Sequence, residues 1–468
     1  MKKLIDVCAV GCNVRRLPRQ VVTRIPVALS VALTIVLATV LAAAVLVRLA
    51  APTVAHADPN NPYDEGRFDA FYTPPDQIGG NPGDVIRSEP SRLVLEPSGQ
   101  LGAFVATGTR IMYHSNDGRG KPAAVTGTYF EPDNPWTGSG PRPLIAFATG
   151  PYGMGEQCAP SRLFNQGIHA SLRTGLDLMI NYEEGFIATM VARGFAVVVT
   201  DGVGMGVHQA GGPQFLNRLA AGQALLDAAR AAMKLPGTSL DAHGPVATWG
   251  WVSGGQASGS AAELAPTYAP ELHLVASWMG APASDIPLGL PFADGSVLVG
   301  ALVGYLINGI MNTFPEARDA LMGTLTVPRG VEMVQRTSAQ CLIQSVDDFA
   351  FRHIQPWFNT DLTELISNDP VKSLLDMQRL GTLKPKAPVM IMSNRYDPII
   401  PHSGADQLAQ DWCAQGADVQ LWTNEQPPFL NKTATNNLLE YFVDGEPAMQ
   451  WMTDRFNGVA TTPNCGQT

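Results

Sequence analysis

Charged residues are scarce in this chain and make up 15% of its 468 positions. Basic residues are also outnumbered, 31 against 41 acidic ones, which gives a formal net charge of −10 at pH 7. Residues 1–57 hold seven basic side chains and one acidic one, so the other 411 positions carry a net charge of −16. No basic run follows Arg48. Nucleic acid is therefore excluded as a partner, because its phosphates require stripes of lysine and arginine.

Cysteine and histidine are also scarce, and neither follows the spacing of a metal site. The four cysteines after residue 57 are far apart, and the chain has no C-x-x-C pair. The eight histidines include no H-x-x-x-H pair. Because zinc sites in sequences are marked by such closely spaced ligands, we expect no metal and no cofactor.

The cysteine pattern instead favours structural disulfides in an oxidising compartment. The four cysteines at positions 158, 341, 413 and 465 allow three pairings. Of these we expect Cys158–Cys341 and Cys413–Cys465, the second of which closes the C-terminal region.

An uncharged hydrophobic run at residues 27–47 follows the basic residues near the N-terminus. Small residues at Ala55 and Ala57 match the two positions that a signal peptidase checks. We therefore predict that residues 1–57 are a signal peptide cleaved after Ala57. Because the run is long enough to span a bilayer, an uncleaved membrane anchor is the alternative. Either reading places the protein outside the cell or at the cell envelope.

Short apolar runs alternate with helical patterns along the rest of the chain. Six runs have the character of strands covered on both faces, at residues 144–149, 195–200, 246–250, 273–278, 389–393 and 419–423. Helical patterns occupy residues 184–192, 217–234, 255–265, 405–414 and 446–456. This alternation predicts an α/β fold with a doubly wound, mostly parallel sheet.

Residues 285–370 interrupt the alternation, since they are too long for one crossover helix. They contain a strongly apolar stretch at residues 297–311. We expect a helical cap inserted between the two parts of the main domain, residues 58–284 and 371–468. The cap would be either an ordinary buried helix pair or a lid over an acyl-chain pocket. The Pro-, Gly- and Asn-rich residues 58–97 are expected to form an extended arm.

Residues 246–257 (VATWGWVSGGQA) have the order strand, Gly-rich turn, helix that surrounds a nucleophile elbow. If Val252 is the apex, its neighbours two before and two after are Gly250 and Gly254, and both fit. If Ser253 is the apex, Trp251 would clash. Sterics therefore favour Val252. Because a β-branched residue at positive φ is costly, we expect the turn to have relaxed.

The chain resembles the secretory lipase family, secreted α/β-hydrolases related to fungal lipase A. The similarity is carried by residues 249–270 (WGWVSGGQASGSAAELAPTYAP), 156–161 (EQCAPS), 199–206 (VTDGVGMG), 225–232 (LLDAARAA), 397–401 (DPIIP) and 448–456. It runs from about residue 82 to residue 456. The resemblance implies an α/β-hydrolase fold and, for active members, hydrolysis of triacylglycerols or fatty-acyl esters.

Matched onto the family pattern, the nucleophile position falls on Val252 and the acid on Asp397, which is retained. The histidine position falls near Asn436 or Asn437, in the loop expected between the last strand and helix. The oxyanion hole would be formed by the Ser253 backbone N–H with a donor from Gly150, Tyr152 or Gly153. Because the chain lacks Ser at the nucleophile position and His at the base position, we expect it to be inactive as a hydrolase.

Two alternatives follow from other residues. One is an active lipase or carboxylesterase with a rearranged dyad of Ser253 and either His208 or His402. The other is a non-catalytic lipid-binding or cell-envelope protein that uses the capped pocket for a lipid or fatty-acyl ligand. The sequence leaves protein partners open.

Overall fold

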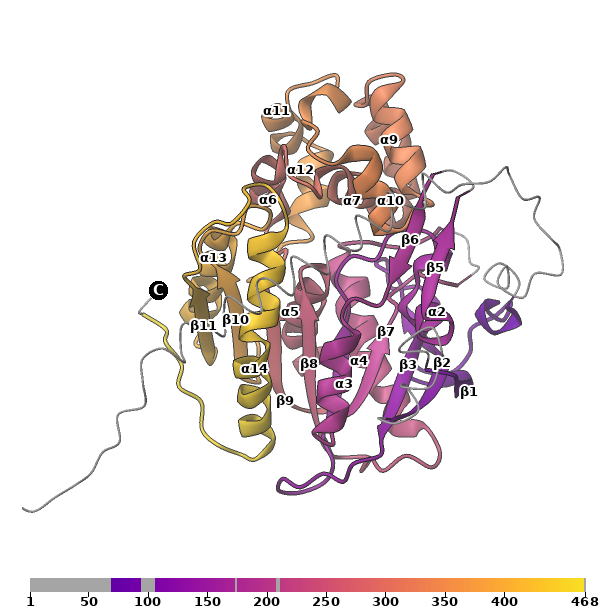
Figure 1. Ribbon diagram of the computed structural model, residues 1–468, viewed down its shortest axis with the longest axis vertical. Helices are drawn as coiled ribbons and strands as arrows, with labels where there is room; N and C mark the ends of the chain where they lie inside the picture. Colours follow the sequence, from indigo (N-terminus) through magenta and orange to yellow (C-terminus); the bar gives the residue numbers. More distant parts are fainter. Residues whose placement is uncertain (1–68, 94–105, 173–174, 208–210, 467–468) are drawn as a thin grey trace, which may run out of the picture. The chain divides into compact units, whose positions relative to one another are not determined.

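The computed structural model describes residues 69–93, 106–172, 175–207 and 211–466. One sheet of nine strands runs in the order β1-β2-β3-β7-β4-β8-β9-β10-β11 (Figure 1). The strands are β1 (Val85–Ser91), β2 (Ala106–Asn116), β3 (Pro122–Pro132), β4 (Leu144–Ala148), β7 (Ala196–Thr200), β8 (Pro245–Trp251), β9 (His273–Gly280), β10 (Val389–Asn394) and β11 (Val419–Asn424). Pairing is parallel from β7 to β11 and antiparallel from β1 to β7.

The six strands expected from apolar runs form the parallel part of the sheet. The antiparallel strands β1, β2 and β3 were not expected. The prediction of an extended arm over residues 58–97 is wrong at β1, which pairs within the sheet. Buried Thr and Ser side chains interrupt the apolar pattern of β2 and β3, for example Ser115, Thr126 and Thr128. A small separate hairpin consists of β5 (Ile168–Ser171) and β6 (Asp177–Ile180).

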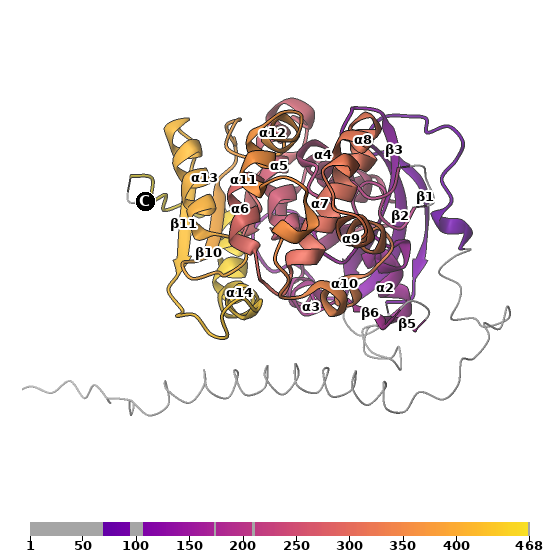
Figure 2. The same cartoon turned by 90° about the horizontal axis from the view of Figure 1, so that it is seen from above.

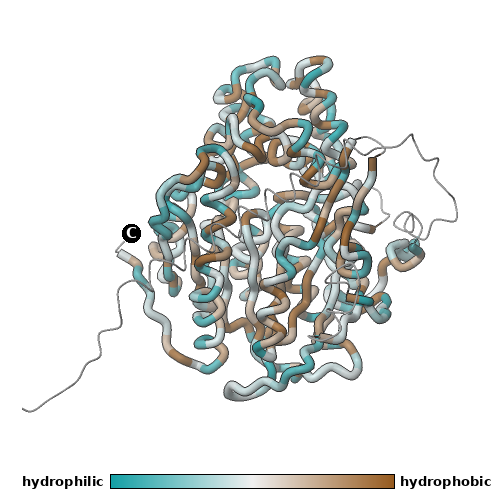
Figure 3. Tube along the Cα trace, in the orientation of Figure 1, coloured by the Kyte–Doolittle hydropathy of each residue, from teal (hydrophilic) through white to brown (hydrophobic). Residues whose placement is uncertain are grey.

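Helices cover both faces of the sheet (Figure 2). On one face, α3 (Glu184–Ala192) and α14 (Thr435–Phe456) pack on the strands, and on the other α4 (Arg218–Lys234) and α5 (Ser253–Tyr268) do so. Further helices are α2 (Pro160–Gln166), α13 (His402–Ala414) and the short η2 (Ala70–Tyr72) and η4 (Glu156–Cys158). The hydrophobic stretches of the trace run along the strands between these layers (Figure 3). The arrangement is the doubly wound α/β sheet that the sequence predicts.

A group of helices fills the chain between β9 and β10 and has a hydrophobic core of its own. Its members are α6 (Ile286–Ala293), α7 (Val299–Thr313), η5 (Pro315–Ala317), α8 (Arg318–Gly323), α9 (Arg329–Thr337), α10 (Leu342–Phe349), η6 (Gln355–Trp357), α11 (Leu362–Ser367) and α12 (Val371–Asp376). They lie together beyond the end of the sheet at which the β8–α5 turn lies (Figure 1). We call this group the cap.

Both expected disulfides are present. Cys413–Cys465 joins the end of α13 to the C-terminal segment, and Cys158–Cys341 joins η4 to the start of α10. The predicted signal or anchor segment, residues 1–57, lies outside the described residues. Within the described ranges, no helix is both long and apolar enough to cross a membrane.

Candidate active site

Val252 occupies the apex of the turn between β8 and α5, with φ 53° and ψ −106°. Gly250 and Gly254, two residues before and two after Val252, have no space for a side chain. A Cβ on Gly250 would lie 2.0 Å from the carbonyl oxygen of Gly254, and one on Gly254 would lie 2.1 Å from that of Ala148. These close approaches fix the register of the elbow on Val252, so a hydrocarbon side chain stands where a nucleophile elbow presents its nucleophile.

The expectation that this turn has relaxed is wrong. Val252 keeps positive φ because three backbone hydrogen bonds hold it. Its N–H donates to Gly280 O at 3.0 Å, and its carbonyl accepts from Gln256 N at 3.0 Å and Ala283 N at 3.3 Å. Strain of this kind costs about 1–3 kcal/mol and persists only where the surroundings over-determine it.

Asp397 lies in the turn after β10 and is almost fully buried. Its carboxylate accepts hydrogen bonds from the backbone N–H groups of Ile399 at 2.8 Å and Ile400 at 3.1 Å, and from Asn437 Nδ2 at 2.6 Å. Burial raises the pKa of Asp397 to about 6, although these hydrogen bonds act to lower it. The carboxyl group thus has the orienting contacts of a triad acid but faces an amide.

The two asparagines that were candidates for the histidine position have different roles. Asn437 donates to Asp397, and its Oδ1 accepts from Trp251 Nε1 at 3.1 Å. Asn436 turns away, since its Oδ1 accepts from Phe429 N at 2.8 Å and its Nδ2 donates to backbone carbonyls of the preceding loop. Both lie in the first turn of α14, so the loop predicted for this segment is wrong at these positions. Asn437 thus links Asp397 to Trp251, the residue that precedes Val252.

Of the two histidines considered as relocated bases, only His402 lies among the described residues, and its Nδ1 has no hydrogen-bond partner there. His402 begins α13, and burial lowers its pKa, while Arg395, Asp406 and Glu425 supply the charges that act on it. Asp397 is not among them. His208 lies outside the described residues. Ser253 is half-buried, and its hydroxyl has no hydrogen-bond partner among the described residues.

The loop from Gly150 to Gly153, which was expected to supply an oxyanion donor, is held by hydrogen bonds on both sides. The Gly150 N–H donates to Glu183 Oε2 at 2.8 Å, so this donor is already engaged and the expectation for Gly150 is wrong. Glu183 also accepts from Tyr441 Oη at 3.1 Å. Burial raises the pKa of Glu183 to about 8, against the opposing effect of these two hydrogen bonds. Tyr152 and Gly153 remain in the loop next to Ser253.

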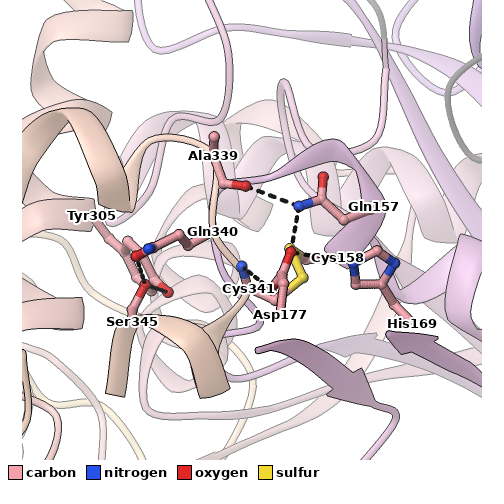
Figure 4. Close-up of a disulfide and its surroundings, with 9 residues drawn as sticks. All are labelled: Gln157, Cys158, His169, Asp177, Tyr305, Ala339, Gln340, Cys341 and Ser345. Atoms are coloured by element: carbon pink, nitrogen blue, oxygen red, sulfur yellow. Dashed lines mark hydrogen bonds and ion pairs between the residues drawn. A yellow bond between two sulfur atoms is a disulfide. The ribbon is translucent and has the colours of Figure 1, made fainter. Parts of the chain in front are cut away.

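The other side of this loop is joined to the cap by backbone pairing and a disulfide. Gly153 pairs with Cys341 in an antiparallel bridge, in which Leu342 N donates to Tyr152 O at 2.9 Å. The Cys158–Cys341 disulfide closes the junction (Figure 4). Backbone pairing and a covalent bond together fix the start of α10 relative to the loop.

Asp177 lies beside this disulfide and accepts three hydrogen bonds. The donors are Gln157 Nε2 at 2.9 Å, Cys341 N at 3.1 Å and His169 Nε2 at 3.2 Å (Figure 4). Burial acts to raise the pKa of Asp177, but His169 and Gln157 hold it below its ordinary value. The ligand atoms of His169, Asp177 and Cys341 lie within 4.8 Å of one another. Because the Cys341 sulfur is bonded to Cys158, it offers no thiolate to a metal.

Two cavities meet at the elbow. The first, which we call the apolar pocket, is open to solvent, and the space between its walls is about 580 Å³ with that open solvent included. Val252 lines it together with residues of α6, α7 and the turn after β10, among them Leu290, Leu302, Leu306, Ile399 and Ile400. The second, which we call the loop chamber, encloses about 690 Å³ with open solvent included. Ser253, Gln256, Asp201 and the loop from Ala148 to Gly153 line it together with apolar side chains such as Val203 and Met205. Phe215 and Leu216 line both cavities.

The chain is similar to known proteins over most of its length. Residues 169–464, more than half of the chain, match the secretory lipase family. The chain belongs to the secretory lipase family. Membership of this family and the two disulfides both indicate an exported protein.

Its relatives include lipases and one protein named as inactive. A probable inactive lipase of Mycobacterium tuberculosis is 26% identical over 397 residues, covering 84% of this chain and 83% of the relative. Lipase 2 of Candida albicans is 28% identical over 415 residues, covering 86% and 83%.

Solved structures show the fold. Candida antarctica lipase A in its closed state superposes with a TM-score of 0.70 at 22% identity and covers 88% of this chain and 90% of its own. The rice cell wall degrading esterase LipA of Xanthomonas oryzae gives a TM-score of 0.61 at 18% identity, covering 80% and 98%. The chain therefore has the α/β-hydrolase fold with helices inserted over the sheet.

Proposed function

We propose that this chain is an exported lipase-fold protein that binds a fatty-acyl lipid without hydrolysing it. The observation that carries the proposal is that Val252 stands at the elbow apex while Asp397 binds the Asn437 amide, which also contacts the neighbouring Trp251. The proposal includes a signal peptide removed after Ala57. An uncleaved anchor at residues 27–47 is the alternative for attachment to the cell envelope.

Acyl transfer by a lipase needs an attacking hydroxyl and a base that takes its proton. Val252 has no heteroatom. The Asn437 amide has no basic nitrogen, and both its polar atoms are engaged by Asp397 and Trp251. In a serine protease, losing either Ser or His costs about 10⁶ in rate. Loss of both groups therefore leaves at most the slow background that binding alone provides.

Binding without turnover is supported by the apolar pocket. Its walls are mainly aliphatic side chains from α6, α7 and the turn after β10, which matches the chemistry of an acyl chain. Val252 adds a further apolar group at the point where a reacting ester would have to meet a nucleophile. Hydrolysis by Ser253 has no matching support, because no described imidazole hydrogen-bonds to its hydroxyl.

We expect purified protein to bind 4-methylumbelliferyl oleate saturably and to return it intact. Leu290→Trp should weaken binding at least about tenfold, since it places an indole in the apolar pocket. Leu288→Trp is the matched control, because this residue is exposed on the same helix and does not line the pocket. The measurement is equilibrium binding followed by chromatography of the recovered ligand. Steady release of methylumbelliferone would refute inactivity, and equal weakening by both variants would refute the pocket assignment.

A further inference from the structure

The two end strands of the nine-stranded sheet, β1 and β11, are protected from pairing with another chain in different ways. β1 contains Pro90 and the charged residues Arg87 and Glu89, and its register with β2 is broken between Val85 and Arg87. Proline, charge and a broken register are the usual protections of an edge strand. β11 has the sequence VQLWTN, without charge or proline, and pairs with β10 in an unbroken register. Such an edge is a template for another strand unless something covers it.

The backbone groups at alternate positions of β11 face outward from the sheet. The carbonyls of Asp418 and Asn424 face β10, since they accept hydrogen bonds at 2.9 Å from N–H groups at its start and just after its end. Successive residues of a strand turn their N–H and carbonyl groups to opposite sides. The backbone groups of Val419, Leu421 and Thr423 therefore point away from β10, along the outer edge.

Asn464 binds these outward groups as a neighbouring strand would. Its backbone N–H donates to Val419 O at 3.1 Å. Its side-chain Oδ1 accepts from Leu421 N at 2.9 Å, and its Nδ2 donates to Leu421 O at 2.8 Å. Asn464 belongs to residues 461–465, which we call the strap. The strap thus occupies the edge at which another strand would add to the sheet.

The strap is held in place by the more exposed of the two disulfides. Cys465, the residue after Asn464, is exposed and is bonded to Cys413 near the end of α13. In the other disulfide, Cys158 and Cys341 both have 0% exposure. Exposed disulfides are the ones that thiols attack most readily. A dithiol in solution therefore reaches the disulfide of the strap before it reaches the one at the cap.

We propose that the strap is a redox-released guard, and that the β11 edge it covers pairs with the same edge of a second copy of this chain. In an antiparallel pair with its two-fold axis at Leu421, Thr423 N donates to Val419 O of the second copy. This register is self-complementary. It places Leu421 opposite its own copy and the carboxylate of Asp418 opposite the neutral amide of Asn424, so no like charges meet.

Release of the strap is a two-electron exchange with a dithiol as the reductant. One thiolate of the dithiol attacks the exposed Cys465 sulfur, and the Cys413 sulfur leaves as a thiolate that takes up a proton. The second thiolate of the reagent then displaces Cys465, which leaves two protein thiols and the oxidised cyclic dithiol. Without the covalent tie, the hydrogen bonds of Asn464 to β11 can be exchanged for those of a second β11.

Sedimentation equilibrium of the purified exported protein tests the proposal. The oxidised protein should be a monomer. Cys413→Ser/Cys465→Ser, which cannot form the disulfide, should have about twice that mass at micromolar concentration. If this variant does not fold, wild-type protein treated with dithiothreitol gives the same comparison. A monomer after loss of the disulfide, or a dimer while it is intact, would overturn the proposal.

Substitutions at Thr423 locate the interface in the Cys413→Ser/Cys465→Ser background. Thr423→Pro removes the outward N–H that the pairing needs but leaves the hydrogen bonds to β10 in place, so the mass should return to that of a monomer. Thr423→Val is the matched control, because it has nearly the same volume and keeps the N–H, and it should stay dimeric. A dimer that persists in Thr423→Pro would place the interface elsewhere and contradict the proposal.

Discussion

Replacing Val252 by serine and Asn437 by histidine together is expected to produce ester hydrolysis that neither change produces alone. The elbow already holds the strained conformation of a nucleophile, and Asp397 already binds the side chain at position 437. Val252→Ser supplies the hydroxyl and Asn437→His supplies the base. Because triad members act as a unit, the double variant should exceed each single variant by about 10³-fold or more on a fluorogenic short-chain ester.

The neighbouring asparagine provides a matched control for this restoration. Val252→Ser combined with Asn436→His should stay at the wild-type level, because Asn436 contacts the preceding loop and not Asp397. Equal rates from the two double variants would show that position 437 is not the base position. An inactive Val252→Ser/Asn437→His protein that folds normally would show that the cleft or the oxyanion loop also differs from that of an active enzyme.

The free energy of unfolding is expected to fall as the pH rises from about 4.5 to 8, and Glu183 contributes to this fall. Burial raises its pKa to about 8 from an ordinary 4.5. The folded state therefore holds a proton that the unfolded chain releases. This stabilisation is complete below pH 4.5 and is lost as the pH rises through 8. The gap between the two values corresponds to at most about 5 kcal/mol.

Glu183→Gln isolates this contribution. The amide cannot ionise, yet it can accept from Gly150 N and donate to Tyr441 Oη. The stability of the variant relative to wild type should therefore rise steadily between pH 5 and 8, measured by denaturant unfolding at a series of pH values. Glu364→Gln, on the exposed surface of α11, should leave the profile unchanged. Parallel profiles for wild type and Glu183→Gln would mean that Glu183 is ionised in the folded protein throughout this range.

The sequence predicted the parts of the molecule that depend on continuous apolar runs and on steric limits. Parallel strands such as β4 and β7 are buried on both faces, so their sequences are apolar without alternation. The elbow register followed from the small residues at Gly250 and Gly254. Asp397 was assigned as the acid by the resemblance of residues 397–401 to the family motif, and that role stays a prediction.

Other features depend on tertiary contacts, and the local sequence therefore does not predict them. The start of α14 could not be placed, because Asn436 and Asn437 favour loops locally, and here they are held by Asp397 and by the carbonyls of the preceding loop. The positive φ of Val252 was not expected, because local preference opposes it and only the packing of β8, β9 and α5 enforces it. Glu183 carries no motif, and its role follows from its contacts with Gly150 and Tyr441, which are distant in sequence.

Labelling by a long-chain fluorophosphonate tests most directly whether the cleft of this protein holds a working nucleophile. The folded wild-type protein should show no mass increase by intact-protein mass spectrometry, whereas the Val252→Ser/Asn437→His variant should gain one adduct. A single stoichiometric adduct on the wild-type protein that disappears in Ser253→Ala would contradict the account, because it would show an activated serine one residue beyond the elbow apex.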